Sequence, residues 1–271
     1  MFPISSLALI SARYTLTALE VAQLLAATHL YTVCQALDLR ALYLEMRQLS
    51  AQLIRDLIRQ VFSISNDDVV NKIATNIVAE VYEVLDRTTN MDTVPRMAKV
   101  ASETVSPLLD ALAALNLSGV DLNKVTEFRT TLSTKLVSLQ NELRCAYMDV
   151  SLSEVRTGSM QSTSSSTALT PIFNLSYRGR TPASDLLAPR TRVLYKYVRE
   201  ELGIPMHGAH NVRGTVFGMR DGLFSGPDAE DIMAAVGGDV DTAIGDKVAI
   251  IVEAIRDGRL PRVLVRACAG V

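Results

Sequence analysis

The chain has 271 residues, of which 48% are hydrophobic, and 27 basic residues nearly balance 29 acidic ones for a formal net charge of −2. This composition provides enough apolar material for a substantial core, while the balanced charge and the 5% aromatic content disfavour nucleic-acid binding. Cys34, Cys145 and Cys268 are far apart and fit neither a zinc-ligand spacing nor a disulfide framework. We therefore predict reduced, mostly buried thiols.

The first part of the chain shows no targeting signal. Residues 1–10 are apolar, but Arg13 follows them, whereas a secretory signal places its positive charge first. The longest uncharged stretch, residues 21–37, contains Gln, Thr and His side chains and is too polar for a lipid-facing helix. We therefore expect a cytoplasmic protein that does not enter the membrane.

Residues 5–61 contain neither Gly nor Pro and are rich in good helix formers, which predicts a long helix. Between residues 7 and 44 this helix is apolar on nearly all sides, as is typical of a helix buried within a large bundle. One chain of this size offers little to surround such a helix. The pattern therefore predicts an oligomer or an additional part of the same fold.

Shorter amphipathic helices are predicted next. Ser65 and Asn66 are candidate N-caps, and Asp67 and Asp68 would meet the positive end of the helix dipole. Pro95 and Pro107 indicate breaks or first turns, and residues 116–121 read as a turn. Two apolar stripes at helical spacing are expected to face the core: Val69, Val70, Ile73, Ile77, Val81, Val84 and Leu85, then Val125, Phe128, Leu132, Leu136, Leu139 and Leu143.

The last third begins with a polar, low-complexity stretch at residues 158–167, which predicts a flexible linker. Pro189 is suited to the first turn of a helix that runs through Glu201 and is ended by Gly203 and Pro205. Residues 206–227 contain five glycines and predict a loop.

A final helix is expected from an apolar face of Ile244, Val248, Ile251, Val252 and Ile255, with Gly258 as its C-cap. A short apolar tail at residues 263–265 follows it. No segment alternates like a β-strand. The predicted fold class is all-α.

Few side chains are candidates for catalysis or metal binding. His207 and His210 are three apart, but in a glycine-rich loop without a neighbouring carboxylate or Cys they are expected to be exposed rather than to hold a metal. His29 is expected to be a satisfied core histidine of the long helix. Asp38 and Arg40 are expected to form polar pairs where that helix meets a neighbour. The alternative is that Asp38 is a catalytic carboxylate.

Four stretches resemble the C-terminal portion of the phenylalanine and tyrosine ammonia-lyases, especially the fungal ones. In this sequence they read Ser6-Leu-Ala-Leu-Ile-Ser-Ala-Arg13; Leu25-Ala-Ala-Thr-His-Leu-Tyr-Thr-Val-Cys-Gln-Ala-Leu-Asp-Leu-Arg40; Leu187-Ala-Pro-Arg190 with Val198-Arg-Glu-Glu-Leu-Gly203; and Ile244-Gly245 with Ile255-Arg-Asp-Gly-Arg-Leu260. Their order and approximate spacing match as well, so the resemblance covers nearly the whole chain.

The resemblance implies a long-helix bundle in which four subunits pack their central helices together. It also implies a division into four parts. Residues 1–62 would be core-bundle helices and residues 63–150 a helical region like the family's shielding domain. Residues 151–188 would be a flexible Ser/Thr-rich linker, and residues 189–271 helices that return to the core.

The chemistry of the family, as the resemblance implies it, eliminates ammonia from an aromatic amino acid to give a cinnamic acid. Its electrophile is a methylidene-imidazolone formed from Ala-Ser-Gly, a tripeptide that this sequence does not contain. Without that electrophile the substrate amine has nothing to add to. The family's Asn-Gln pair falls on Met1-Phe2, and Ser5 replaces a family Asn. We therefore assign no catalytic, cofactor-binding or metal-binding residue and expect no cofactor in this chain.

Three functions remain open. The chain is a portion of an ammonia-lyase that is inactive alone, or a non-catalytic helical module that assembles with a full-length lyase, or an enzyme with new chemistry in a pocket of the remaining fold. The first two imply a homo-oligomer or an association with a lyase chain, and neither implies nucleic acid or membrane.

Overall fold

The computed structural model describes residues 4–115, 121–148, 173, 175–176, 178–207 and 244–269. These residues form helices and contain no β-strand, which confirms the all-α prediction. The elements are, in chain order, α1 (Ile4–Phe62), α2 (Asp67–Arg87), α3 (Thr93–Glu103), α4 (Val105–Ala114), α5 (Leu122–Met148), the 3₁₀ helix η1 (Ser184–Leu186), α7 (Pro189–Lys196), the π-helix η2 (Tyr197–Glu201), α10 (Ile244–Arg256) and α11 (Arg259–Ala269).

The chain divides into two compact units, one of residues 1–41 and 178–271 and the other of residues 42–177. The boundary falls inside α1. The four parts expected from the sequence remain a prediction, and most of the expected linker and of the glycine-rich loop lies outside the described residues, as does the expected turn at 116–120. Residues 184–186, within the expected linker, form η1.

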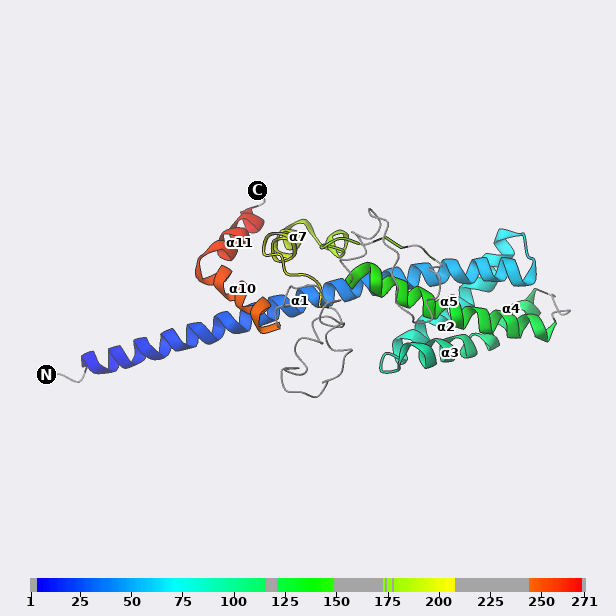
Figure 1. The fold of residues 1–271 in the computed structure, drawn as a ribbon, viewed down its shortest axis with the longest axis horizontal. Coiled ribbons are helices and arrows are strands. Elements are labelled where there is room, and N and C mark those ends of the chain that lie inside the picture. Colours follow the sequence, from blue (N-terminus) through cyan, green and yellow to red (C-terminus); the bar gives the residue numbers. More distant parts are fainter. Residues whose placement is uncertain are drawn as a thin grey trace, which may run out of the picture. The chain divides into compact units, whose positions relative to one another are not determined.

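In the unit of residues 42–177, α2, α3, α4 and α5 gather along the last part of α1 (Figure 1). Asn66 caps α2 as predicted, because its side-chain oxygen accepts hydrogen bonds from the backbone N–H groups of Asp68 and Val69. Both predicted stripes face the core, except that Val69 is only half-buried. Their members Ile73, Ile77, Phe128 and Leu132 are fully buried.

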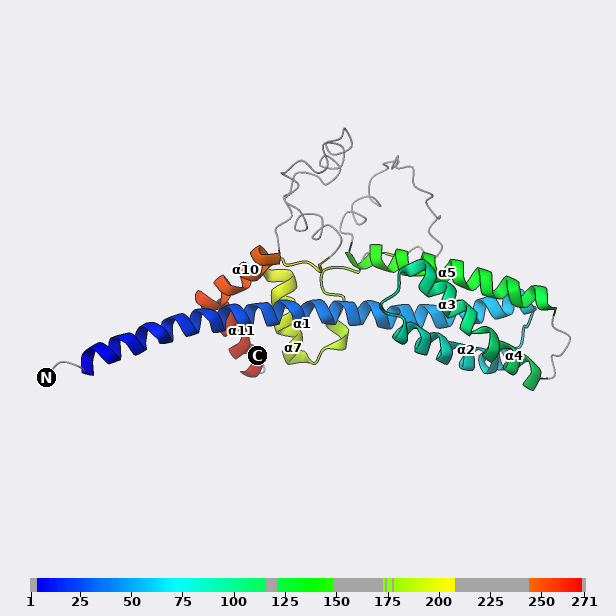
Figure 2. The ribbon, with the colours of Figure 1, turned by 90° about the horizontal axis from the view of Figure 1, so that it is seen from below.

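In the other unit, α7, α10 and α11 lie beside the earlier part of α1 (Figure 2), and α11 packs against both α7 and α10. The predicted helix from Pro189 to Glu201 is present, but its last turn is a π-helix, since the backbone N–H of Leu202 donates to the carbonyl of Tyr197. Gly203 then turns the chain with a φ of 68°.

The prediction of a short apolar tail at residues 263–265 was wrong, because these residues lie in the middle of the helix α11. Leu260, Val263 and Ala267 form its buried face at helical spacing. Pro261 lies in the first turn of α11, where a proline is tolerated because its missing N–H would have no intrahelical partner. Gly258 lies between α10 and α11 with a φ of 79°, as the C-cap prediction requires.

Candidate functional site

In the unit of residues 1–41 and 178–271, the part of α1 that belongs to it buries one face and leaves the rest exposed. Ala27, Tyr31, Cys34, Asp38 and Ala41 are buried and recur every three or four residues, which places them on one side of the helix. Before Ala27 nearly every described side chain is exposed. The expectation of a helix surrounded on all sides is therefore not met by this chain alone.

The exposed part of α1 is strongly apolar. Leu7 is 65% exposed, Tyr14 74% and Leu25 70%. Further large apolar side chains are exposed on the same stretch: Leu9, Ile10, Leu16, Leu19, Val21 and Leu24. A contiguous apolar surface of this length is typical of an interaction surface rather than of the surface of a monomer.

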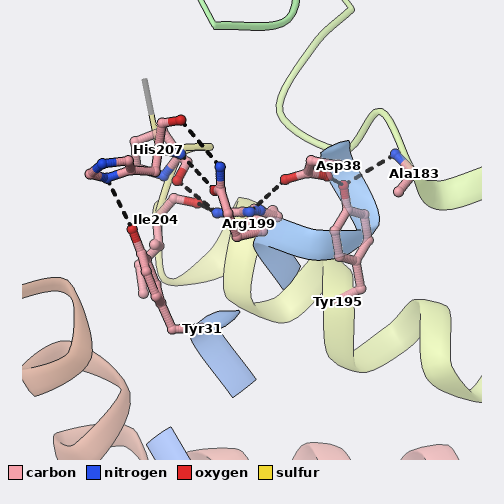
Figure 3. A network of polar contacts seen from close by, with 9 residues as sticks. Tyr31, Asp38, Ala183, Tyr195, Arg199, Ile204 and His207 are labelled. Carbon is pink, nitrogen blue, oxygen red and sulfur yellow. Dashed lines mark hydrogen bonds and ion pairs between the residues drawn. The ribbon is translucent and has the colours of Figure 1, made fainter. Parts of the chain in front are cut away.

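A buried polar cluster lies on the covered face of α1 (Figure 3). Asp38 and Arg199 form a salt bridge in which both side chains are 0% exposed. The Tyr195 hydroxyl donates a hydrogen bond to the other carboxylate oxygen of Asp38 and accepts one from the backbone N–H of Ala183 at 3.2 Å. Asp38 thus holds α1, α7 and η2 together, and the prediction that it forms a polar pair is confirmed.

The other terminal nitrogen of the Arg199 guanidinium hydrogen-bonds to the backbone of the residues that follow η2. Its Nη1 donates to the carbonyls of Ile204 and Pro205 at 3.0 and 2.7 Å. No partner exists for the buried Nε of Arg199 among the described residues. A buried charge is tolerated only when it is paired and hydrogen-bonded, and here one carboxylate and two carbonyls meet that requirement.

The electrostatics of the cluster follow from burial. Burial raises the pKa of the Asp38 carboxyl, while the Arg199 guanidinium and the Tyr195 hydroxyl oppose that rise. Burial and the hydrogen bond to Asp38 raise the pKa of the Tyr195 phenol. Burial likewise raises the pKa of the neighbouring Cys34 thiol to about 11. The Tyr195 phenol and the Cys34 thiol therefore hold their protons at neutral pH.

His207 departs from the prediction of an exposed loop histidine. Its backbone N–H donates to Gln35 Oε1 at 2.7 Å, and its carbonyl accepts from Gln35 Nε2 at 3.2 Å. Its ring Nδ1 lies 3.4 Å from the Tyr31 hydroxyl. No local pattern in the sequence predicts this contact, because Gln35 lies 172 residues away in the chain. His210 lies outside the described residues.

The other predicted residues are scattered. His29 is exposed on α1, so the expectation of a core histidine was wrong for this chain, and Arg40 is also exposed. Cys34 is buried, but Cys145 and Cys268 are exposed, which corrects the prediction of mostly buried thiols.

Within the described ranges, no three His, Cys, Asp or Glu side chains gather to hold a metal ion. No described helix is both long and apolar enough to cross a membrane.

The arrangement of the buried cluster suits it to positioning rather than to catalysis. Its carboxylate is fully buried and is already bound by a guanidinium and a phenol. A general base must reach a substrate proton within hydrogen-bond distance. Both oxygens of Asp38 are buried and already accept hydrogen bonds, so the geometry does not support a catalytic carboxylate.

Comparison with known proteins gives a consistent family. The chain is 34% identical over 267 residues to the phenylalanine ammonia-lyase of Strobilurus tenacellus, with 97% of this chain and 30% of that protein aligned. It is 31% identical over 272 residues to the phenylalanine/tyrosine ammonia-lyase of Rhodotorula toruloides, with 98% and 30% aligned. No family model matches the chain.

Comparison with solved structures leads to the same family as the sequence comparison. A crystal structure of phenylalanine ammonia-lyase from the yeast Rhodosporidium toruloides superposes with a TM-score of 0.66 at 27% identity and covers 97% of this chain and 32% of the yeast chain. The chain thus spans about 30% of the length of the curated relatives it matches. By sequence and by fold, it belongs to the phenylalanine ammonia-lyase family and corresponds to the C-terminal portion of its fungal members.

Proposed function

We propose that this chain is the C-terminal helical portion of an aromatic amino acid ammonia-lyase and that it has no lyase activity by itself. The observation that carries the proposal is the absence of Ala-Ser-Gly from its 271 residues. That tripeptide is the source of the electrophile expected from the family resemblance. The part of the chain that is present supplies helices for assembly: α1 with its exposed apolar stretch, and the buried cluster that attaches α7 and η2 to it.

An assay on the purified chain tests the catalytic half of this proposal. The chain is incubated with phenylalanine and with tyrosine, and the formation of cinnamate and coumarate is followed by ultraviolet absorbance. We expect no product above the buffer control, while a full-length fungal phenylalanine ammonia-lyase at equal concentration gives a clear signal. Sustained product formation by the purified chain would overturn the proposal.

The exposed apolar stretch of α1 favours a second, related function, in which the chain assembles with a full-length lyase or with further copies of itself. Burial of large apolar side chains contributes roughly 25 cal/mol per Å² removed from water, so a stretch of this kind stabilises any complex that covers it. The chain would then contribute helices to an oligomer without contributing chemistry.

Co-expression with a full-length relative, followed by size-exclusion chromatography and mass spectrometry of the peak, tests the assembly. We expect mixed oligomers with the unaltered chain and their loss in the double variant Leu16→Glu/Leu25→Glu. The matched control, Gln52→Glu/Gln60→Glu, adds the same charge at exposed polar positions of the same helix. Equal association of both variants would show that the apolar stretch is not the contact surface.

A further inference from the structure

Three of the four residues that follow Gly203 use their backbone to hydrogen-bond to side chains of η2 and α1, and the His207 ring also lies 3.4 Å from the Tyr31 hydroxyl. The carbonyls of Ile204 and Pro205 accept hydrogen bonds from Arg199 Nη1. Both backbone polar groups of His207 are paired with the side-chain amide of Gln35. Figure 3 shows Arg199 between Asp38 on one side and this backbone segment on the other.

We propose that Gln35, Asp38 and Arg199 form a latch that binds the backbone of residues 204–207 to α1 and that opens and closes as one unit. The proposal concerns the conformation of the C-terminal part and is independent of any catalytic activity. Its basis is that one guanidinium joins the two halves of the contact: Nη2 binds the carboxylate of Asp38, and Nη1 binds the backbone segment.

The shared guanidinium makes the contacts interdependent. Arg199 is fully enclosed with the segment in place, and without residues 204–207 it would lose two of its three hydrogen-bond acceptors. An insufficiently paired charge in an apolar interior is costly, so the segment and the salt bridge favour each other. Gln35 lies three residues before Asp38 on the same helix and binds the far end of the segment, so both ends of the latch are fixed on one rigid element.

The local backbone prepares the segment for this contact. Gly203, with its positive φ, turns the chain out of η2, and the N–H of Ile204 closes that turn on the carbonyl of Val198 at 3.2 Å. Pro205 cannot continue a helix, and its missing N–H leaves its carbonyl as its only backbone hydrogen-bonding group. The segment therefore presents two carbonyls to Arg199 of η2 and the backbone amide of His207 to Gln35 of α1.

Residue-resolved amide hydrogen exchange distinguishes a latch from independent contacts. The decisive variant is Asp38→Leu/Arg199→Met, which removes both buried charges and keeps apolar volume, so that α1 and α7 stay packed. If the latch acts as one unit, the amide of His207 exchanges at least tenfold faster in this variant, although its own acceptor, Gln35, is unchanged. The amides of α1 and α7 keep their exchange rates.

Gln35→Leu provides a second, milder variant whose folding is not at risk from an uncompensated charge. We expect it to speed exchange at His207 and also at Ile204, which Gln35 does not contact. Gln23→Leu is the matched control, because it is the same substitution on the same helix and removes a contact to the Arg256 side chain instead. It leaves both amides unchanged.

Three results would overturn the proposal, of which two concern single amides and the third concerns the whole chain. One is exchange at His207 that stays within about twofold of the unaltered chain in Asp38→Leu/Arg199→Met. The other is an effect of Gln35→Leu that is confined to His207 and leaves Ile204 at its original rate. A uniform acceleration of all amides, including those of α10, would equally count against a latch, because it would show general unfolding.

Discussion

Asp38 and Arg199 lie 161 residues apart in the chain and form a salt bridge that is closed to solvent on both sides. Because the two side chains come from α1 and from η2, this bridge fixes the C-terminal helices to the long helix. Removing one partner alone is therefore expected to lower the free energy of unfolding far more than removing both.

Asp38→Asn leaves the buried Arg199 guanidinium without a counter-charge. We expect the free energy of unfolding to fall by about 3–5 kcal/mol. Asp38→Leu/Arg199→Met removes both charges and should cost far less than the single change, because no unpaired charge remains. Urea denaturation followed by circular dichroism measures both. The exposed pair Arg256–Glu253 gives the control, and Glu253→Gln should have a much smaller effect. Equal losses for Asp38→Asn and Glu253→Gln would contradict the assignment.

The sequence predicted much of this arrangement and failed where two distant segments meet. The long helix, the Asn66 cap and the Gly258 turn each depend on neighbouring residues, and each is present. Asp38 was expected to pair, but nothing local identifies Arg199 as its partner.

The contact of His207 with Gln35 escaped prediction for the same reason, since a loop composition describes local backbone preference and not what the loop packs against. The exposure of residues 7–26 of α1 follows instead from what this chain alone provides. Their apolar pattern predicts a covered helix, and the described residues do not cover it, so the prediction of a covering partner stays a prediction.

The thiols should react in two classes. Cys145 and Cys268 are exposed, whereas Cys34 is 1% exposed and burial raises its pKa to about 11. The thiolate is the reactive species, so Cys34 is protected both by access and by protonation at pH 8. Ellman's reagent should modify two thiols of the native chain rapidly and the third only after unfolding in urea. Rapid reaction of all three in the native chain would show that the covered face of α1 is open.

Alkaline pH should weaken the fold through the same thiol. The pKa of Cys34 is about 11 in the folded chain against 9.0 for the ordinary thiol, so between these values the folded state binds more protons than the unfolded state. Stability from this group is therefore complete below pH 9 and falls as the pH rises toward 11, by about 2–3 kcal/mol in all. Burial also raises the pKa values of Tyr31 and Tyr195, which gives the same direction.

Urea midpoints measured between pH 8 and pH 11 test this dependence, and Cys34→Ala should reduce its slope while lowering stability at all pH values. A midpoint that is constant over this interval would contradict the burial of these groups.

Arg96 completes the C-terminal end of α2. Its guanidinium donates to the carbonyl of Leu85 at 2.6 Å and to the Thr88 hydroxyl at 3.3 Å. The last carbonyls of a helix have no intrahelical donor, so the Arg96 side chain satisfies one of them. Arg96→Ala should lower the free energy of unfolding by about 1–3 kcal/mol. Arg144→Ala, which removes an exposed 3.3 Å contact to Thr93, is the control and should have little effect. Comparable losses in urea titrations of the two variants would show that Arg96 does not act as a cap.

Gly245 and Gly258 allow the effect of backbone conformation on stability to be compared without steric clashes from an added side chain. A Cβ added at Gly245 or at Gly258 would meet no atom within 4 Å. Gly245 lies within α10, where alanine is the better helix former, whereas Gly258 has a φ of 79° that side-chain-bearing residues rarely adopt. Gly258→Ala should therefore destabilise the chain by about 1 kcal/mol or more, and Gly245→Ala should stabilise it by up to about 1 kcal/mol. Thermal unfolding of the two variants side by side measures the difference. The same sign for both changes would mean that the turn between α10 and α11 is not held in the left-handed conformation.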